Sequence, residues 1–316
     1  MTNFPKNAKI VIPGGAGLVG QNLVVCLLEN GYSNIYVIDK NSNNARICQE
    51  LHPNVTVITE DISKEGIWIE HVKEADIIIQ LQAQIGGLHE REFIDNNVTS
   101  TSLLLESINK EKPPYIIHIS SSVVNSLADD FYTQTKEKQE DLVKSSGHDF
   151  VILRPTLMFG WFDRKHLGWL ARFMQKIPVF PIPGHGKYIR QPLYVMDFCN
   201  IITSCIKSKP EKEIYNISGL ERVDYIDIIK AIKKVTNAKA TILKIPYSLF
   251  YMLLKIYALF SSNPPFTTKQ LEALVIKEEF EMIEWPDIFN ISKTPFEKAI
   301  DETFNHKTYS DIVLEF

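Results

Sequence analysis

The feature that most constrains the fold lies in residues 9–28, which read KIVIPGGAGLVGQNLVVCLL. An apolar run enters a cluster of glycines, and apolar residues then recur at the three- and four-residue spacing of a helix. The pattern predicts a strand, a tight turn and a helix. The turn contains four glycines, Gly14, Gly15, Gly17 and Gly20. Their spacing matches both G-x-G-x-x-G and the variant G-x-x-G-x-x-G, which seat a pyrophosphate on a helix N-terminus.

Glycines serve such a site because they lack a Cβ atom. One permits the tight turn, one lets backbone amides approach the phosphates, and one lets the helix pack closely on the strand. We therefore expect Gly14, Gly15 and Gly17, with Leu18 and Val19 at the start of the helix, to bind a dinucleotide. The alternative is a glycine turn with a purely structural role.

An acidic residue at the expected distance favours the dinucleotide. A second predicted strand, residues 35–38, ends at Asp39, which lies 19 residues beyond Gly20. A carboxylate there accepts hydrogen bonds from the adenosine ribose hydroxyls and would repel a 2′-phosphate, so NAD rather than NADP is the predicted cofactor. Lys40 and Arg46, which are nearby in the sequence, argue against that preference.

Composition limits the class of protein. The chain has 316 residues, 45% apolar and 23% charged, as expected of a soluble enzyme with one large or two smaller domains. The net charge of −4 gives no basic excess, so nucleic acid is excluded as the main partner. The four cysteines lack C-x-x-C spacing, so we expect buried free thiols, no metal site and a cytoplasmic location. We expect no signal segment and no membrane span.

Strands and helices alternate along the first half of the chain. Further apolar runs typical of strands are residues 55–59, 76–81, 115–120 and 150–153. Such alternation predicts an α/β fold, a doubly wound parallel sheet of the Rossmann type. We predict an NAD-binding domain at 1–160 and a mainly substrate-binding domain at 161–316. Later strands near 190–219, including 214–217, should return to the sheet.

The residues that suggest catalysis follow the fifth predicted strand. Ser122 lies at its carboxyl end, where open α/β sheets place their sites, and Tyr132 and Lys136 follow with Y-x-x-x-K spacing. On a helix that spacing puts both side chains on one face, so the ammonium can stabilise a phenolate whose ordinary pKa is about 10. We favour a catalytic tyrosine over an incidental exposed pair.

Together these motifs resemble those of the extended short-chain dehydrogenases/reductases in the NAD-dependent epimerase/dehydratase family. The matching motifs are GGAGLVG at 14–20, Asp39, Asp61-Ile62, Asn97, Ser122, Tyr132-x-x-x-Lys136, Leu153-Arg154-Pro155, segment 184–197 and segment 294–303. The match covers nearly the whole chain. It implies an NAD cofactor and a nucleotide-sugar substrate.

The resemblance also implies roles for individual residues. Tyr132 would exchange a proton with a sugar hydroxyl, Lys136 would hold the nicotinamide ribose and lower the Tyr132 pKa, and Ser122 would hydrogen-bond the reacting oxygen. Arg190 would clamp the nucleotide diphosphate, an ordinary surface arginine being the alternative. Further residues expected at the dinucleotide are Asp61, Ile62, Leu81, Gln82, Ala83 and Asn97.

Some of these positions have structural alternatives. Asp61 would cap a helix instead of meeting the adenine, and Asn97 would cap the helix that it begins. Arg154 precedes a proline and is expected to be structural.

Departures from the family pattern bear on catalysis. The usual His-Leu-Ala-Ala is QLQA at residues 80–83, the usual Tyr-Gly after the serines is Asn125-Ser126, and the interval from Ser122 to Tyr132 is short. A substrate-covering loop is therefore predicted to be missing. The shortening also resembles the atypical branch that includes the accessory subunit of respiratory complex I, whose members bind a dinucleotide without clear turnover.

Three other stretches are open to interpretation. Residues 247–260 carry one charge and are too short to cross a bilayer, so a buried or subunit-facing helix is preferred over one that contacts a membrane surface. Residues 161–177 would either line an entrance for an anionic substrate or form an amphipathic packing helix. The asparagine-rich residues 41–44 are predicted to be a solvated loop.

The predicted function is NAD-dependent nucleotide-sugar 4-epimerisation or 4-keto reduction, by hydride transfer with a tyrosine base, in polysaccharide biosynthesis. A 4,6-dehydratase is not expected, because family dehydratases carry an acidic pair where this chain has Val123 and Val124. The alternatives are a non-sugar carbonyl or alcohol oxidoreductase, and an assembly or redox-sensing protein that binds the dinucleotide without turnover. A homodimer is left open.

Overall fold

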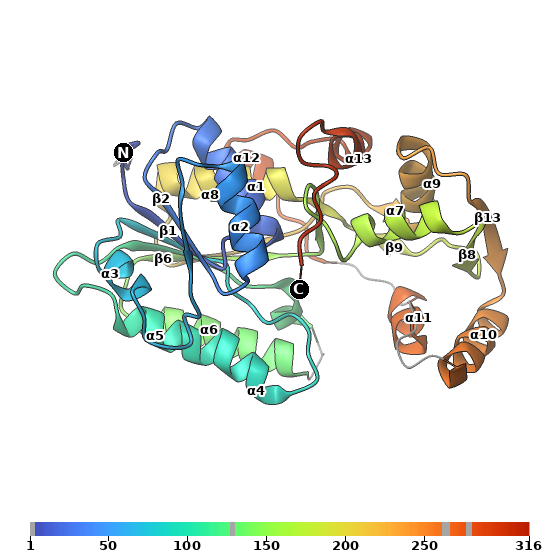
Figure 1. The fold of residues 1–316 in the computed structure, drawn as a ribbon, viewed down its shortest axis with the longest axis horizontal. Helices are drawn as coiled ribbons and strands as arrows, with labels where there is room; N and C mark the ends of the chain where they lie inside the picture. The colour runs from blue at the N-terminus through green and yellow to red at the C-terminus, as the bar shows by residue number, and fades with distance from the viewer. Residues whose placement is uncertain (1–3, 127–129, 261–265, 276–279, 316) are drawn as a thin grey trace.

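The central element of the fold is a parallel sheet of seven strands (Figure 1). The computed structural model describes residues 4–126, 130–260, 266–275 and 280–315. In spatial order the strands are β11 (Glu213–Ile217), β6 (Phe150–Pro155), β5 (Tyr115–Ile119), β4 (Ile77–Gln80), β1 (Ile10–Pro13), β2 (Ile35–Asp39) and β3 (Thr56–Thr59). The order reverses between β1 and β4, which is the switch point where doubly wound sheets bind their ligands.

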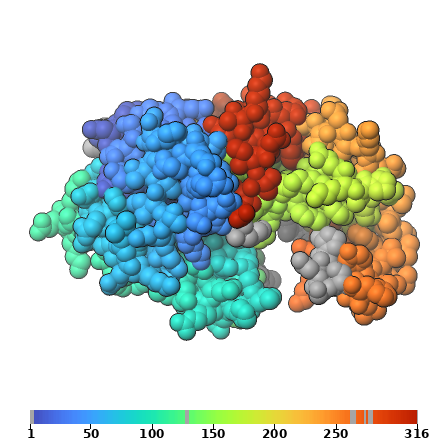
Figure 2. Space-filling model, in the orientation of Figure 1, coloured from blue at the N-terminus to red at the C-terminus, as the bar shows by residue number. Residues whose placement is uncertain are grey.

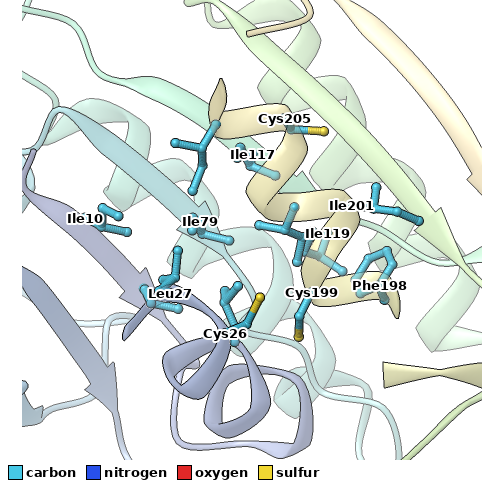
Figure 3. Packing of buried hydrophobic residues seen from close by; sticks show 14 of the residues in the cluster. Ile10, Cys26, Leu27, Ile79, Ile117, Ile119, Phe198, Cys199, Ile201 and Cys205 are labelled. Atoms are coloured by element: carbon cyan, nitrogen blue, oxygen red, sulfur yellow. The ribbon is translucent and has the colours of Figure 1, made fainter. Parts of the chain in front are cut away.

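Helices cover both faces of this sheet, which explains why its strands are apolar on both sides. One face is covered by α1 (Leu18–Glu29), α8 (Val195–Ser208) and α12 (Trp285–Phe289). Figure 3 shows side chains of α1 and α8 packed among isoleucines of β1, β4 and β5. The other face is covered by α3 (Trp68–Lys73), α5 (Ser100–Glu106) and α6 (Phe131–Ser145). The predicted fold class is therefore confirmed.

The chain has further helices and paired strands besides the sheet and the helices that cover it. The remaining helices are α2 (Ser42–Leu51), α4 (Glu90–Phe93), η1 (Ile94–Thr99), η2 (Ser122–Asn125), α7 (Leu167–Lys176), α9 (Tyr225–Val235), α10 (Tyr247–Phe260), α11 (Thr268–Val275) and α13 (Phe296–Asn305). The paired strands are β7 (Met158–Phe159) with β10 (Leu193–Tyr194), β9 (Ile189–Arg190) with β12 (Val223–Asp224), and β8 (Val179–Pro183) with β13 (Thr241–Ile245). Helices α7, α9 and α13 share a buried apolar cluster.

Three expectations from the sequence can be compared with these elements. All four cysteines are buried free thiols, as predicted. The loop predicted at residues 41–44 is wrong, because the Asn41 side chain accepts a hydrogen bond from the Asn44 amide at 2.9 Å and caps α2. Residues 161–177 contain the packing helix α7, in which Ala171 and Met174 are buried.

Helix α10 differs from the buried helix that its apolar sequence suggested. All fourteen of its residues are described, and none is buried. The prediction that residues 247–260 are buried within the chain is therefore wrong. Contact with another subunit and contact with a membrane surface stay predictions. No helix within the described ranges combines the length and apolarity needed to cross a bilayer.

Candidate active site

The carboxyl end of β1 leads into the glycine turn, and two of its glycines are required by close packing. Gly14 has a φ of +75°, and a Cβ atom there would lie 2.5 Å from the Gln82 backbone. A Cβ at Gly20 would lie 2.2 Å from the Gly15 carbonyl oxygen. Any larger residue at Gly14 or Gly20 would therefore push the turn away from β4 or from α1.

Gly17 has different surroundings, and these fit a pyrophosphate. It is the N-cap of α1, and a Cβ there would meet only the Gly14 carbonyl oxygen, at 3.6 Å. Open space therefore lies before the helix N-terminus, where Leu18 and Val19 form the first turn and that turn contains no acidic residue. Helix N-termini present unpaired amides and a positive dipole end, so this space suits an anion.

Asp39 lies beside the glycine turn, as its spacing predicted. Its carboxylate accepts hydrogen bonds from the amides of Ala16 at 3.1 Å and Asn41 at 3.0 Å. Burial raises the pKa of Asp39, and these amides work against that rise. The backbone thus fixes the carboxylate at the end of β2, next to the proposed phosphate position.

Asp61 and Ile62 follow β3. Asp61 accepts hydrogen bonds from the Ser63 amide at 3.0 Å and hydroxyl at 2.7 Å, in a turn that precedes α3 by several residues. The helix-cap alternative for Asp61 is therefore wrong. Ile62 is buried in the apolar core on the face of the sheet that α3, α5 and α6 cover.

Leu81, Gln82 and Ala83 leave β4 beside the glycine turn. The Leu81 amide donates to the Pro13 carbonyl oxygen at 2.9 Å. Within the described structure, the buried Gln82 Oε1 has no hydrogen-bond partner. This polar group next to Gly14 further fits a site for a dinucleotide.

Asn97 is fully buried within a continuous helical run, in the π-helical segment η1. Its Oδ1 accepts from the Gln84 amide at 2.7 Å, and its Nδ2 donates to Thr135 Oγ1 at 2.9 Å. The predicted capping role is wrong, since Asn97 does not begin a helix. It ties the segment after β4 to α6 instead.

Tyr132 lies in the first turn of α6, which Asp130 caps by accepting from the Thr133 amide at 2.8 Å. Burial raises the pKa of the Tyr132 phenol, and a hydrogen bond with the Ser121 hydroxyl opposes that rise. The serine beside Tyr132 is thus Ser121. Ser122, which the sequence analysis proposed as the donor to the reacting oxygen, is buried at the start of η2.

Lys136 is buried one turn further along α6. Its Nζ donates to the Ile119 carbonyl oxygen at 2.9 Å and to Gln139 Oε1 at 2.7 Å. Burial lowers the Lys136 pKa to about 7, while the charge of Glu140 raises it. The expected lowering of the Tyr132 pKa by Lys136 is not what this geometry shows, because the amine is directed to the end of β5.

A chain of buried polar groups continues from Lys136. Gln139 Nε2 donates to Thr101 Oγ1 at 2.8 Å, and Gln80 Nε2 donates to the same hydroxyl at 2.7 Å. His118 Nδ1 is 2.9 Å from Gln80 Oε1, and burial and Lys136 hold the His118 pKa well below its ordinary range. The replacement of the family's usual histidine by Gln80 therefore belongs to a connected network under the site.

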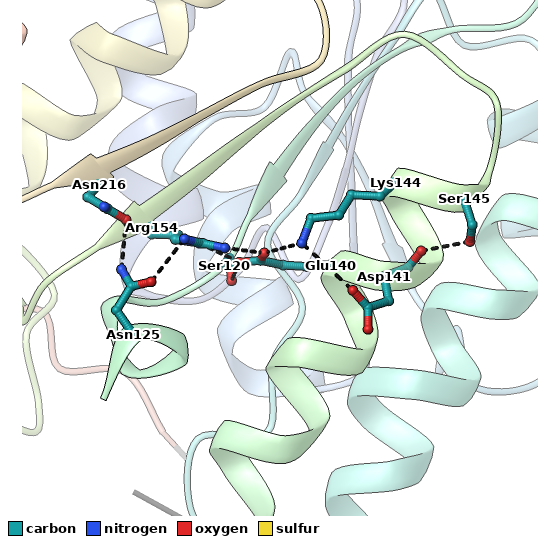
Figure 4. A network of polar contacts seen from close by, with 8 residues as sticks. All are labelled: Ser120, Asn125, Glu140, Asp141, Lys144, Ser145, Arg154 and Asn216. Carbon is teal, nitrogen blue, oxygen red and sulfur yellow. Dashed lines mark hydrogen bonds and ion pairs between the residues drawn. The ribbon is translucent and has the colours of Figure 1, made fainter. Parts of the chain in front are cut away.

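A second polar network holds the ends of β5 and β6 together (Figure 4). The Glu140 carboxylate accepts from Ser120 Oγ at 2.6 Å, from Arg154 Nε and Nη2 at 2.8 and 2.7 Å, and from Lys144 Nζ at 2.9 Å. Burial alone would raise the Glu140 pKa, but these donors lower it to about 2. Arg154 has the structural contacts expected from the sequence.

Arg190 lies on β9, outside the central sheet. Its guanidinium donates to the carbonyl oxygens of Ile189, at 2.8 Å, and of Leu274 in α11. The Arg190 guanidinium is therefore bound to backbone carbonyls within the second half of the chain.

Sequence reasoning missed Thr101, Gln139 and Glu140. Glu140 follows Lys136 by four residues, so the helical period already placed both on one face. Gln139 and Thr101 come from different helices 38 residues apart, and the sequence carries no signal for that pairing.

The chain is similar to one protein family and to named proteins of several organisms. Residues 10–218 match the model of the NAD dependent epimerase/dehydratase family. The low-salt glycan biosynthesis protein Agl12 of Haloferax volcanii is 28% identical over 246 residues, which span 67% of this chain and 77% of that protein. A dTDP-glucose 4,6-dehydratase of an Actinoplanes species is 22% identical over 74% of this chain and 83% of its own length.

A solved structure shows the same fold. The UDP-glucuronic acid 4-epimerase from Bacillus cereus, in complex with NAD, superimposes with a TM-score of 0.69 at 22% identity, covering 93% of this chain and 96% of that one.

Proposed function

The chain belongs to the NAD dependent epimerase/dehydratase family, and on that premise we propose that it is a nucleotide-sugar 4-epimerase or 4-keto reductase. Membership confirms the extended short-chain dehydrogenase/reductase type, an enzymatic role and NAD as the cofactor. The sugar position and the type of reaction are the new parts of the proposal.

The observation that carries the proposal is the arrangement at the carboxyl ends of β1 and β5. The space before α1 would hold the pyrophosphate, and Asp39 would accept hydrogen bonds from the adenosine ribose. When bound, NAD supplies a hydride acceptor, and its reduced form supplies the hydride donor. The protein residues then have to move a proton at the sugar hydroxyl.

Tyr132 is the group proposed for that proton transfer. Its phenol is hydrogen-bonded to Ser121 and has a raised pKa, so at neutral pH it holds its proton until a base or a nearby cation favours ionisation. Lys136, one helical turn away, is the proposed cation and ribose ligand, and it would take up that role by exchanging its contacts with the Ile119 carbonyl oxygen and Gln139. Ser122 and its neighbour Ser121 are the proposed hydrogen-bond donors to the reacting oxygen.

Epimerisation or reduction is favoured over dehydration by the residues that follow these serines. Elimination of water from C5 and C6 needs an acid for the departing hydroxyl and a base for the C5 proton. Val123 and Val124, in η2, offer neither.

The substrate part of the site is proposed in residues 161–316, with the dinucleotide in residues 1–160. Arg190 would clamp the diphosphate by exchanging its contact with the Leu274 carbonyl for phosphate oxygens. We also propose a cytoplasmic enzyme of polysaccharide biosynthesis, with a homodimer as its candidate assembly.

The test is to incubate the protein with NAD and common UDP- and dTDP-hexoses and to follow the sugar by NMR. Inversion at C4, or oxidation of NADH by a supplied 4-keto sugar, is expected. Tyr132→Phe should lose turnover by about a hundredfold to ten-thousandfold while its NAD affinity is unchanged. Full activity of Tyr132→Phe would refute the tyrosine assignment, and accumulation of a 4-keto-6-deoxy sugar would refute the reaction type.

Serine variants give a matched comparison for the same assay. Ser121→Ala removes the hydroxyl paired with Tyr132, so it should shift the pH profile of turnover. Ser122→Ala should reduce turnover without that shift.

A further inference from the structure

Helix α10 exposes one broad face of apolar side chains. Those at least one-third exposed are Tyr247, Leu249, Met252, Leu253, Ile256, Tyr257, Leu259 and Phe260. At 100° per residue all of them except Tyr247 fall within an arc of about 160°, and Phe250, Tyr251 and Leu254 on the other side of the helix are half-buried. Phe250 stacks on Phe266 on the side facing α11, with ring centroids 6.2 Å apart.

The area involved is unusual for a surface. At about 200 Å² for a fully exposed large apolar side chain, α10 presents on the order of 800 Å² of apolar surface. The largest apolar patch on an ordinary monomer is about 300–600 Å². An apolar hollow of ≈ 660 Å³, lined by Met252, Leu259 and Phe266 among others, extends this surface toward α11.

Helix α10 lies at the periphery of the molecule. In Figures 1 and 2 it lies at the lower right corner of the molecule, remote from the central sheet and joined to the body through β13 and α11. A projecting helix with one continuous apolar face can lay that face on a lipid layer.

The charges of the sequence segment that contains α10 also favour lipid. The chain as a whole has a net charge of −4, yet residues 230–271 contain no Asp or Glu. The same segment contains seven lysines, Lys230, Lys233, Lys234, Lys239, Lys244, Lys255 and Lys269. Basic residues beside an apolar segment are attracted to anionic headgroups, at about 1 kcal/mol for each residue near the surface.

From the exposed apolar face and the acid-free basic segment, we propose that α10 docks the protein onto an anionic membrane surface. At 14 residues and about 1.5 Å per residue, the helix is about 21 Å long, shorter than the bilayer core of about 30 Å. It therefore enters the interface without crossing the membrane. This inference does not depend on the proposed sugar chemistry.

Vesicle flotation of the full chain tests the docking. The wild-type protein should float with mixed phosphatidylcholine–phosphatidylglycerol vesicles at low salt, and less with phosphatidylcholine alone. The double change Leu253→Glu and Leu259→Glu should lower the bound fraction at least about tenfold. Changing Lys244, Lys255 and Lys269 to Gln should lower the partition coefficient by about a hundredfold and remove its salt dependence.

Ile67→Glu is the matched control, because Ile67 is 65% exposed but lies before α3, on the central-sheet side of the molecule. Each variant should keep the wild-type melting temperature and NAD affinity, since α10 has no buried residue. Wild-type protein that stays with neither vesicle type would overturn the proposal. Glutamate variants that float like the wild-type protein would also overturn it. A third contrary result would be a wild-type protein that binds no vesicles and is a dimer by light scattering, with the α10 variants monomeric.

Discussion

Replacing Glu140 by glutamine should destabilise the protein in a way that depends on pH. The carboxylate is 1% exposed and accepts hydrogen bonds from Ser120, Arg154 and Lys144. These donors lower its pKa from an ordinary 4.5 to about 2 in the folded state. Folding therefore favours the ionised form, and the resulting stability is present above pH 4.5 and lost as the pH falls toward 2.

The size of this effect follows from the shift. A change of about two and a half pKa units corresponds to about 3 kcal/mol of stability at pH 7. At pH 3, where the unfolded carboxylate is already protonated, about two-fifths of this stability remains. The difference in unfolding free energy between wild type and Glu140→Gln should thus narrow by roughly 2 kcal/mol between pH 7 and pH 3.

Urea unfolding at both pH values measures this difference. Glu137→Gln changes an exposed glutamate on the same helix and should show a difference near zero at either pH. A wild-type advantage over Glu140→Gln that is the same at pH 7 and pH 3 would refute the assignment of a buried, charge-stabilised carboxylate.

Two further predictions concern the dinucleotide. Gly17→Val places its side chain in open space, so it should keep the melting temperature but weaken NAD binding at least about tenfold. Gly20→Val should weaken NAD binding and also lower the melting temperature, because its Cβ would lie 2.2 Å from the Gly15 carbonyl oxygen. Equal NAD affinity of Gly17→Val and wild type in a calorimetric titration would contradict the proposed phosphate position. Asp39→Ala should weaken NAD binding by about 10- to 150-fold, since hydrogen bonds to a charged group contribute about 1.5–3 kcal/mol, and should narrow the preference over NADP. Tighter binding of NADPH than NADH to the wild-type protein would contradict the role of Asp39.

Local patterns predicted the parts of the structure that local physics determines. The strands of the sheet, the glycine turn and Asp39 depend on apolar runs and fixed spacing, and they lie within two residues of their predicted positions. The surroundings of Lys136 could not be predicted in this way. Its partner Gln139 is held by Thr101, and only the packing of α6 on α5 brings those residues together.

Two predictions were wrong for different reasons. Asn97 looked like a helix start, but the helical run begins earlier, because α4 and η1 continue into α5. Helix α10 looked buried because a short apolar run does not reveal whether other parts of the chain cover it.

The central claim is that a hydride leaves and returns at C4 of the sugar. It is tested most directly with a nucleotide hexose carrying deuterium at C4, incubated with the protein and NAD and analysed by NMR. We predict a product inverted at C4 that retains deuterium at C4, or, for a reductase, deuterium delivered to C4 of a 4-keto sugar from deuterated NADH. Deuterium recovered at C6 of a 4-keto-6-deoxy sugar would contradict the claim, because it would mean that water was eliminated before the hydride returned.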